Sequence, residues 1–187
     1  HPRKARKPPE PMPQWKGMAD TFTVKFQTTK GDFAIEINPE WAPLGAARFK
    51  ELVEMGYYDS SKFFRVVPGF VVQFGLPADP AAMPEVSNLK DDPVTQSNVK
   101  GSITFATAGP GTRTSQVFIN LTDNKRLDSM GFSPFGKITQ GMEVVESLFG
   151  GYGDNGPDQG RIRRFGNSYI EGSFPKLDGI VKASIEA

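Results

Sequence analysis

Apolar and polar residues alternate along two short stretches near the start of the chain, 22–27 and 33–37. A period of two is typical of β-strands that bury one face. The sequence Thr-Lys-Gly-Asp at 29–32 predicts a turn, so these two strands should pair as a hairpin. Similar runs predict further strands at 62–65, 70–74, 102–106, 117–120, 134–138, 161–170 and 179–185.

Two other stretches have the period of an α-helix. Between Ala42 and Met55, apolar residues recur at three- and four-residue spacing and Gly56 marks an end, and 142–149 has a shorter pattern of the same kind. The segment 76–100 is polar and contains proline, so we expect a long irregular loop. About eight strands with only two helices do not fit a regular βαβ alternation. We therefore predict a mainly β fold, a closed eight-stranded antiparallel β-barrel capped by two α-helices.

The composition excludes several kinds of catalytic chemistry. The chain of 187 residues has no cysteine, and its one histidine is His1. Thiolate nucleophiles, multi-histidine metal sites and a Ser-His-Asp triad are therefore excluded, and we expect neither a metal nor another cofactor. Residues 151–156 fit the letters G-x-G-x-x-G, but they follow a predicted helix, which is the wrong context for dinucleotide binding. Asp154, Asn155 and Asp158 lack the spacing of a calcium loop, and we interpret them as a solvated turn.

The first 21 residues differ from the rest of the chain. They contain five basic residues and five prolines without apolar periodicity. We predict an extended basic arm at 1–21, which could dock onto a partner protein, and one domain at 22–187. The charges of the arm alone do not indicate a nucleic-acid partner, and no apolar run approaches the ~18 residues that a membrane span needs. The start at His1 and the lack of cysteine favour a secretory or organellar lumen over the cytoplasm.

Three segments carry residues that are unusual in a β protein, 63–73, 104–120 and 126–136. The first reads Phe-Phe-Arg-Val-Val-Pro-Gly-Phe-Val-Val-Gln, and an arginine is seldom buried in such a strand without a partner. Arg65 is therefore either an outward-facing edge residue or, together with Gln73, a polar group that rises from one sheet face into a pocket. The small, polar middle of the second segment would let a peptide backbone approach.

In this order and spacing, the three segments resemble the cyclophilin family of peptidyl-prolyl cis–trans isomerases, and the resemblance covers roughly 22–187. It implies an eight-stranded barrel with two helices and an enzyme that needs no cofactor, accelerates rotation about X–Pro bonds and so assists protein folding. It also implies that Arg65, Phe70 and Gln73 are catalytic. The substrate-binding residues that it implies are Val71, Ala106, Thr107, Gln116, Phe118, Leu127 and Phe132.

Two departures from the family pattern concern ligands. Val71 stands where a methionine is usual, and Arg126 stands where some members have the tryptophan that grips cyclosporin. The resemblance therefore implies proline-containing peptides and proteins as partners and a weakened affinity for cyclosporin. The alternative function is a proline-binding or scaffold subunit of a larger assembly, docked through the arm at 1–21. The presence of Arg65 and Phe118 favours the enzyme over the scaffold.

Overall fold

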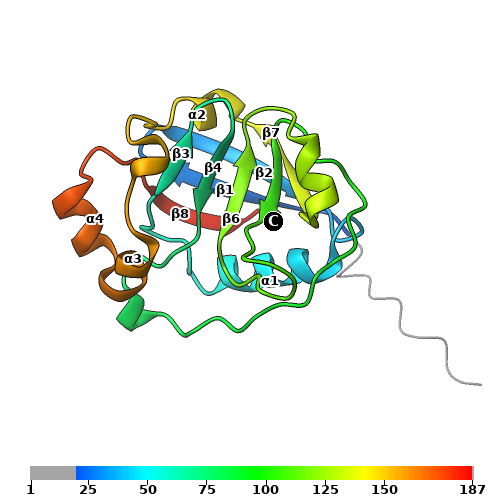
Figure 1. Ribbon diagram of the computed structural model, residues 1–187, viewed down its shortest axis with the longest axis horizontal. Helices are drawn as coiled ribbons and strands as arrows, with labels where there is room; N and C mark the ends of the chain where they lie inside the picture. Colours follow the sequence, from blue (N-terminus) through cyan, green and yellow to red (C-terminus); the bar gives the residue numbers. More distant parts are fainter. Residues whose placement is uncertain (1–19, 187) are drawn as a thin grey trace, which may run out of the picture.

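Eight strands form one antiparallel sheet, which confirms the predicted fold class (Figure 1). The computed structural model describes residues 20–186, so most of the predicted arm lies outside the described residues. The order of the strands along the sheet is β3-β4-β6-β5-β7-β2-β1-β8. They are β1 (Phe22–Thr28), β2 (Gly31–Ile37), β3 (Arg65–Val67), β4 (Val71–Phe74), β5 (Ser102–Phe105), β6 (Val117–Asn120), β7 (Pro134–Gln140) and β8 (Ile180–Ile185).

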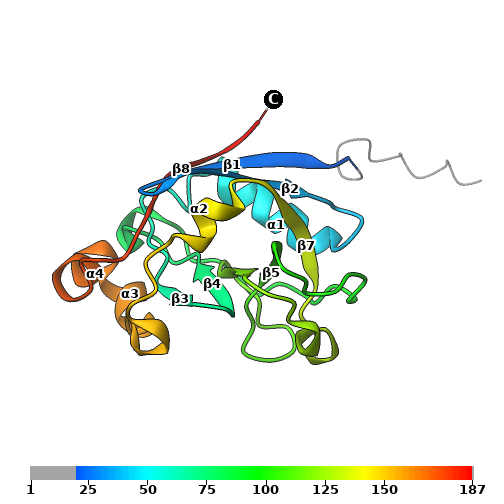
Figure 2. The ribbon, with the colours of Figure 1, turned by 90° about the horizontal axis from the view of Figure 1, so that it is seen from above.

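The sheet curls strongly, but no ladder of hydrogen bonds joins its edge strands β3 and β8 within residues 20–186 (Figures 1 and 2). The two edges meet just before β3, where Lys62 forms an isolated bridge with Gly179. There the Phe63 N–H also donates to the Asp178 carbonyl at 3.0 Å. Because this contact ends before β3 begins, the predicted closure was overstated, and the sheet is a curled half-barrel.

Both predicted helices are present, α1 (Pro43–Glu54) and α2 (Met142–Glu146). Pro43 stands in the first turn of α1, where a missing N–H costs nothing. One face of α1 turns Phe49 and Leu52 into the interior of the curled sheet, where both are fully buried. The predicted irregular loop at 76–100 contains one short 3-10 helix, η1 (Pro80–Ala82). Two further 3-10 helices are η2 (Lys125–Met130) and η3 (Gly153–Asn155).

The strand predicted at 161–170 was wrong, because this region forms two helices, α3 (Gln159–Phe165) and α4 (Asn167–Ser173). The Asp158 carboxylate accepts a hydrogen bond from the Arg161 N–H at 2.9 Å and so caps the start of α3. Gly166 separates the helices with a φ of 62°, and a Cβ at this position would collide with the Ala78 carbonyl oxygen, so no side chain would fit there. The helices bury Ile162 and Ile170 in a small second core with Phe64 and Leu76.

The main core is aromatic and lies inside the curl. Phe26 and Phe33 face each other across the β1–β2 hairpin, with ring centroids 4.9 Å apart. Phe74 packs edge-on against Phe26 at 5.6 Å and thereby joins the two halves of the sheet. Each such buried ring contributes about 1.5–3 kcal/mol, so this cluster holds the curled sheet rigid beneath the strands that carry Arg65.

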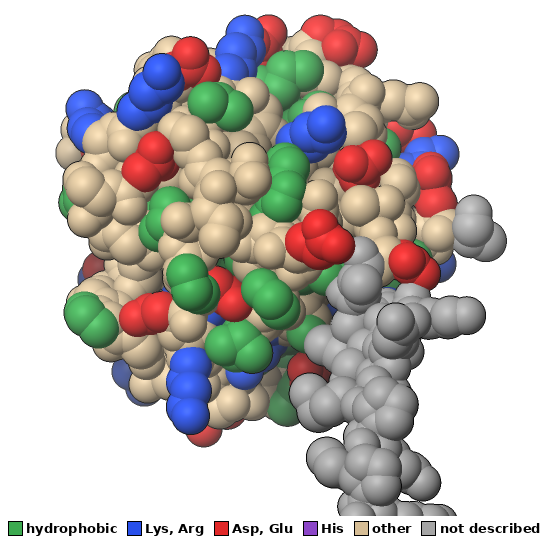
Figure 3. All heavy atoms as spheres, turned by 90° about the vertical axis from the view of Figure 1, so that its right-hand side faces the viewer, with side chains coloured by type: hydrophobic (Ala, Val, Ile, Leu, Met, Phe, Trp, Pro, Cys, Tyr) green, Lys and Arg blue, Asp and Glu red, His purple; other side chains and the backbone are tan. Residues whose placement is uncertain are grey.

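Within residues 20–186, no helix has both the length and the apolar composition needed to cross a bilayer. On the face of the molecule in Figure 3, acidic and basic side chains are interspersed, and neither sign gathers into one patch on the part that is not grey. This part of the surface therefore lacks the continuous basic stripe by which proteins follow a nucleic-acid backbone.

Candidate active site

Three neighbouring strands place Arg65, Gln73 and Phe118 in one row across the sheet. In the β3–β4 ladder Arg65 lies directly opposite Gln73, and in the β4–β6 ladder Gln73 lies directly opposite Phe118. Directly opposed residues on neighbouring strands present their side chains on the same face of the sheet. Of the two alternatives for Arg65, the structure therefore has the one in which it rises with Gln73 from one sheet face.

A cavity of about 170 Å³ lies on this face. Three buried apolar side chains, Val71, Phe118 and Leu127, form a small cluster of their own beneath it. The ring of Phe132 packs edge-on against Phe118, with centroids 5.6 Å apart. Nine of the ten residues predicted from the family resemblance line this one cavity: Arg65, Phe70, Val71, Gln73, Ala106, Thr107, Phe118, Leu127 and Phe132.

The tenth, Gln116, lines an adjoining cavity of about 180 Å³ that shares Gln73, Ala106 and Thr107 with the first. It also belongs to a chain of hydrogen bonds along the rim. Nη1 of Arg65 donates to Oε1 of Gln73 at 3.1 Å, and Nε2 of Gln73 donates to Oε1 of Gln116 at 2.8 Å. Because each amide accepts on one side and donates on the other, the chain fixes the orientation of both amides.

Sequence analysis missed a partner of Arg65. Its Nε donates to Oδ1 of Asp154 at 2.7 Å, and the side chains of this ion pair are 31% and 63% exposed. The two residues are 89 positions apart, and Asp154 belongs to η3. It is one of the three residues, with Asn155 and Asp158, that the sequence predicts as a solvated turn. A solvated turn accounts for the exposure of Asp154, but it does not predict the ion pair with Arg65.

Two cations lie over the ring of Phe70 at the edge of the cavity. The guanidinium carbon of Arg65 is 5.8 Å from the ring centroid, and that of Arg126 is 5.1 Å from it. Cation–π contacts of this length are attractive and are worth about 0.5–1 kcal/mol at exposed sites. Phe70 is thus in cation–π contact with two arginines, of which Arg65 lines the cavity with it.

A buried polar network supports the opposite wall. The carboxylate of Asp128 accepts hydrogen bonds from Ser97 Oγ at 2.6 Å and from the backbone N–H of Asn98 at 2.8 Å. The Asn98 side chain also donates to Asp128 and to the Phe132 carbonyl. Burial raises the pKa of Asp128, but these hydrogen bonds together outweigh it and hold the pKa below its usual value. The network fixes the backbone that carries Leu127 and Phe132.

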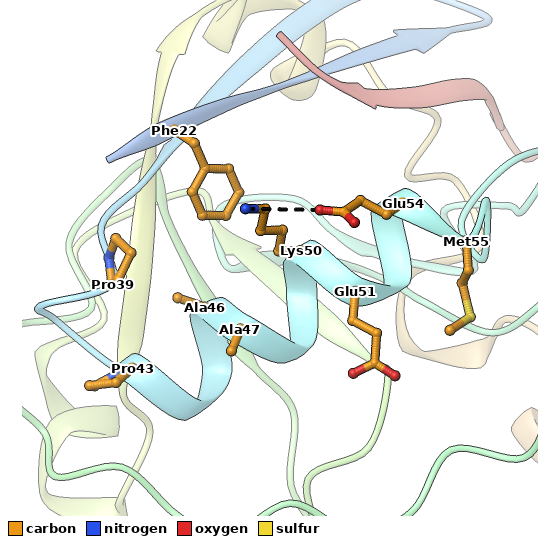
Figure 4. Close-up of a pocket in the computed structure, with 9 residues that line it drawn as sticks. All are labelled: Phe22, Pro39, Pro43, Ala46, Ala47, Lys50, Glu51, Glu54 and Met55. Atoms are coloured by element: carbon orange, nitrogen blue, oxygen red, sulfur yellow. Dashed lines mark ion pairs between the residues drawn. The ribbon is translucent and has the colours of Figure 1, made fainter. Parts of the chain in front are cut away.

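A larger groove, of about 530 Å³, lies between α1 and the start of β1 (Figure 4). It is mostly apolar, and one ion pair lies along its α1 side, from Lys50 to Glu54 at 4.0 Å. None of the residues predicted for the site lines it. The candidate chemistry therefore belongs to the smaller cavity and its neighbour, where Arg65, the amides of Gln73 and Gln116 and an apolar pocket lie together.

Comparison with known proteins agrees with this geometry. The family profile described as "Cyclophilin type peptidyl-prolyl cis-trans isomerase/CLD" matches residues 23–166. Peptidyl-prolyl cis-trans isomerase A of Dickeya dadantii is 35% identical over 134 residues, which are 67% of this chain and 70% of the relative. Peptidyl-prolyl cis-trans isomerase-like 3 of Neurospora crassa is 35% identical over 137 residues, 68% of this chain and 81% of the relative.

Solved structures show the same fold. A cyclophilin-type peptidyl-prolyl cis-trans isomerase of Cryptosporidium parvum has a TM-score of 0.65 at 21% identity, and the match covers 90% of this chain and 99% of that one. The chain therefore belongs to the cyclophilin-type peptidyl-prolyl cis–trans isomerase family. It is an isomerase of X–Pro peptide bonds, and members of the family bind proline-containing peptides.

Proposed function

We propose that Arg65, Phe70 and Gln73 catalyse the rotation and that the cavity beside them holds the proline ring of the substrate. The observation that carries this proposal is the position of the Arg65 side chain, next to Gln73, in the lining of a cavity whose other walls are mostly apolar. A rigid apolar pocket suits a pyrrolidine ring, and a charged donor at its rim can reach the bond that precedes the ring. This arrangement requires no nucleophile, metal or proton relay.

The physical basis is the electronic change during rotation. Amide resonance gives the C–N bond a barrier of about 18–20 kcal/mol, and unaided X–Pro exchange takes tens to hundreds of seconds. When the bond twists, resonance is lost and the lone pair localises on the prolyl nitrogen. A hydrogen-bond donor aimed at that nitrogen therefore stabilises the transition state more than either ground state, which is the condition for catalysis. Arg65 can supply such a donor, because a guanidinium carries five N–H groups.

The other residues bind the substrate. Phe118, Leu127 and Phe132, with Val71, surround the proline ring and keep it still while the preceding carbonyl swings. The row Ala106, Thr107 and Gln116 lines the passage into the adjoining cavity, and we assign it to the peptide backbone that precedes the proline. One structure of the Cryptosporidium parvum relative was determined in the presence of the dipeptide Ala-Pro, a ligand of the kind that this assignment requires.

The test is isomerisation of a short Ala-Pro peptide, followed by exchange NMR. Replacing Arg65 with alanine should lower kcat/KM by about 100-fold, the effect of removing one preorganised donor at a developing charge. Arg164→Ala is the matched control, because Arg164 is an exposed arginine of α3 that lines neither cavity. An Arg65→Ala variant as active as the native chain would refute the assignment.

The same experiment decides between the enzyme and its alternative. We assign catalysis to a domain at 22–187, and the proline-rich composition of 1–21 supports a separate arm that docks onto a partner protein. If the native chain did not accelerate exchange at all, the cavity would serve binding only, and the scaffold function would replace the catalytic one. We also propose that cyclosporin binds weakly, because Arg126 stands where some members of the family have a tryptophan and Val71 stands where a methionine is usual.

A further inference from the structure

The segment from η3 to the start of α3 holds both ends of the rim chain. At one end Asp154 accepts from Nε of Arg65 at 2.7 Å. At the other end Gln159 accepts from Nε2 of Gln116 at 3.2 Å. The two contacts come from residues only five positions apart, and the hydrogen-bonded row of Arg65, Gln73 and Gln116 lies between them.

This segment is anchored to the body of the domain. Tyr152 packs between Phe149 and Phe174, with ring centroids 5.1 Å apart in both pairs. Pro157 is buried, and the backbone N–H of Asp158 donates to the Tyr169 hydroxyl at 3.1 Å. These contacts lie on both sides of Asp154, so its carboxylate is presented to Arg65 from a fixed backbone.

The contact with Asp154 engages Nε, the guanidinium nitrogen that carries a single N–H. Nε of Arg65 is bound by Asp154, and Nη1 gives one hydrogen to Gln73. A guanidinium has five N–H donors in a rigid plane, so fixing Nε and Nη1 fixes the directions of all the others. The donors that remain are those at the tip of the side chain, where Arg65 reaches the cavity wall.

We propose that Asp154 is a positioning residue for the isomerase reaction, which holds the guanidinium plane of Arg65 in the orientation that catalysis requires. The inference rests on the proposed role of Arg65. A long arginine side chain that is one-third exposed loses this orientation readily, because several rotamers are open to it. Placing a donor correctly before the bond twists removes that reorganisation from the barrier.

The test compares Asp154→Ala with Asp154→Asn. Alanine removes the acceptor, and we expect kcat/KM to fall about two- to fivefold, the factor that corresponds to an exposed ion pair. The fall should be in kcat with KM little changed, because an orientation of Arg65 that matters in the transition state does not hold the ground-state peptide. Asparagine keeps an oxygen acceptor without charge, and it should restore most of the lost rate.

A direct signature of the contact is the exchange of the Arg65 Nε–H with solvent, measured by NMR. This exchange should be slow in the native chain and fast in Asp154→Ala. The control is Asp32→Ala, which breaks another exposed ion pair, with Lys25 at 3.4 Å, and lies outside both cavities. It should change neither the rate of isomerisation nor the exchange of the Arg65 proton.

Two results would overturn the positioning role. One is a native kcat/KM and native Nε–H exchange in Asp154→Ala. The other is an equal loss in the alanine and asparagine variants, which would assign the effect to charge rather than to orientation. If Arg65→Ala lost activity while Asp154→Ala did not, the positioning role would fail and the proposed function would stand. If Arg65→Ala were fully active, the proposed function itself would fail.

Discussion

Replacing Asp92 with alanine should destabilise the domain by about 3 kcal/mol, since breaking a buried ion pair by removing one partner costs about 3–5 kcal/mol. Nη1 of Arg113 lies 3.1 Å from Oδ2 of Asp92, and the two side chains are 5% and 3% exposed. The same carboxylate accepts hydrogen bonds from the backbone N–H groups of Leu44 and Gly45 at 3.0 and 2.9 Å. One aspartate thus neutralises an arginine next to the binding cavities and caps the start of α1.

The size of this loss of stability depends on the groups that lose their partner when the Asp92 carboxylate is removed. The guanidinium of Arg113 would stay buried without its partner, and α1 would lose a cap worth about 1 kcal/mol. Asp91 lies 3.9 Å from Nε of Arg113 and can take over part of the charge pairing, so we place the cost at the lower end of the range. A change of this size should lower Tm by about 6–12 °C in a domain of this length.

The measurement is urea unfolding of the native chain and Asp92→Ala, with Asp32→Ala as the control. The exposed pair of Asp32 and Lys25 should contribute less than about 1 kcal/mol. In a double variant with Arg113→Leu, part of the loss caused by Asp92→Ala should be recovered, because no buried charge is left uncompensated. The reasoning is refuted if Asp92→Ala costs no more than Asp32→Ala, or if the double variant is the least stable of all.

Two other predictions concern the rim of the cavity. Because the folded-state pKa of Asp128 is lowered, its stabilising effect is complete above the unfolded value of about 3.9 and is lost as the pH falls through the folded value. The difference in unfolding free energy between native and Asp128→Asn should therefore be constant from pH 7 to about pH 5 and shrink in more acidic buffer; a difference that grows with acid contradicts this. Replacing Arg126, which lies over Phe70, with tryptophan should increase the affinity for cyclosporin in calorimetry, and no gain would count against our account of the rim.

Most of the fold could be predicted because its signals are local. The strands of the hairpin and the helix α1 have apolar periods that a short window of sequence contains. The pairing of Arg65 with Gln73 could also be inferred from the sequence. Pro68 and Gly69 form a tight turn between two short strands, and the turn fixes the register of the strands. Helices α3 and α4 were missed because their apolar positions are few and they pack on Phe64 and Leu76, which are distant in sequence.

The ion pair of Arg65 and Asp154 could not be predicted from the sequence. Nothing in the residues around Asp154 indicates an arginine partner, because the contact depends on how the loop after α2 brings η3 against the first residue of β3, Arg65. The family resemblance supplies the arginine and the apolar pocket, but the orientation of the guanidinium is decided by the groups that occupy its Nε and Nη1. Relatives with the same pocket but a different loop should therefore hold the guanidinium of the corresponding arginine in a different orientation. Differences in the rate of isomerisation between such relatives should accordingly follow the loop rather than the pocket.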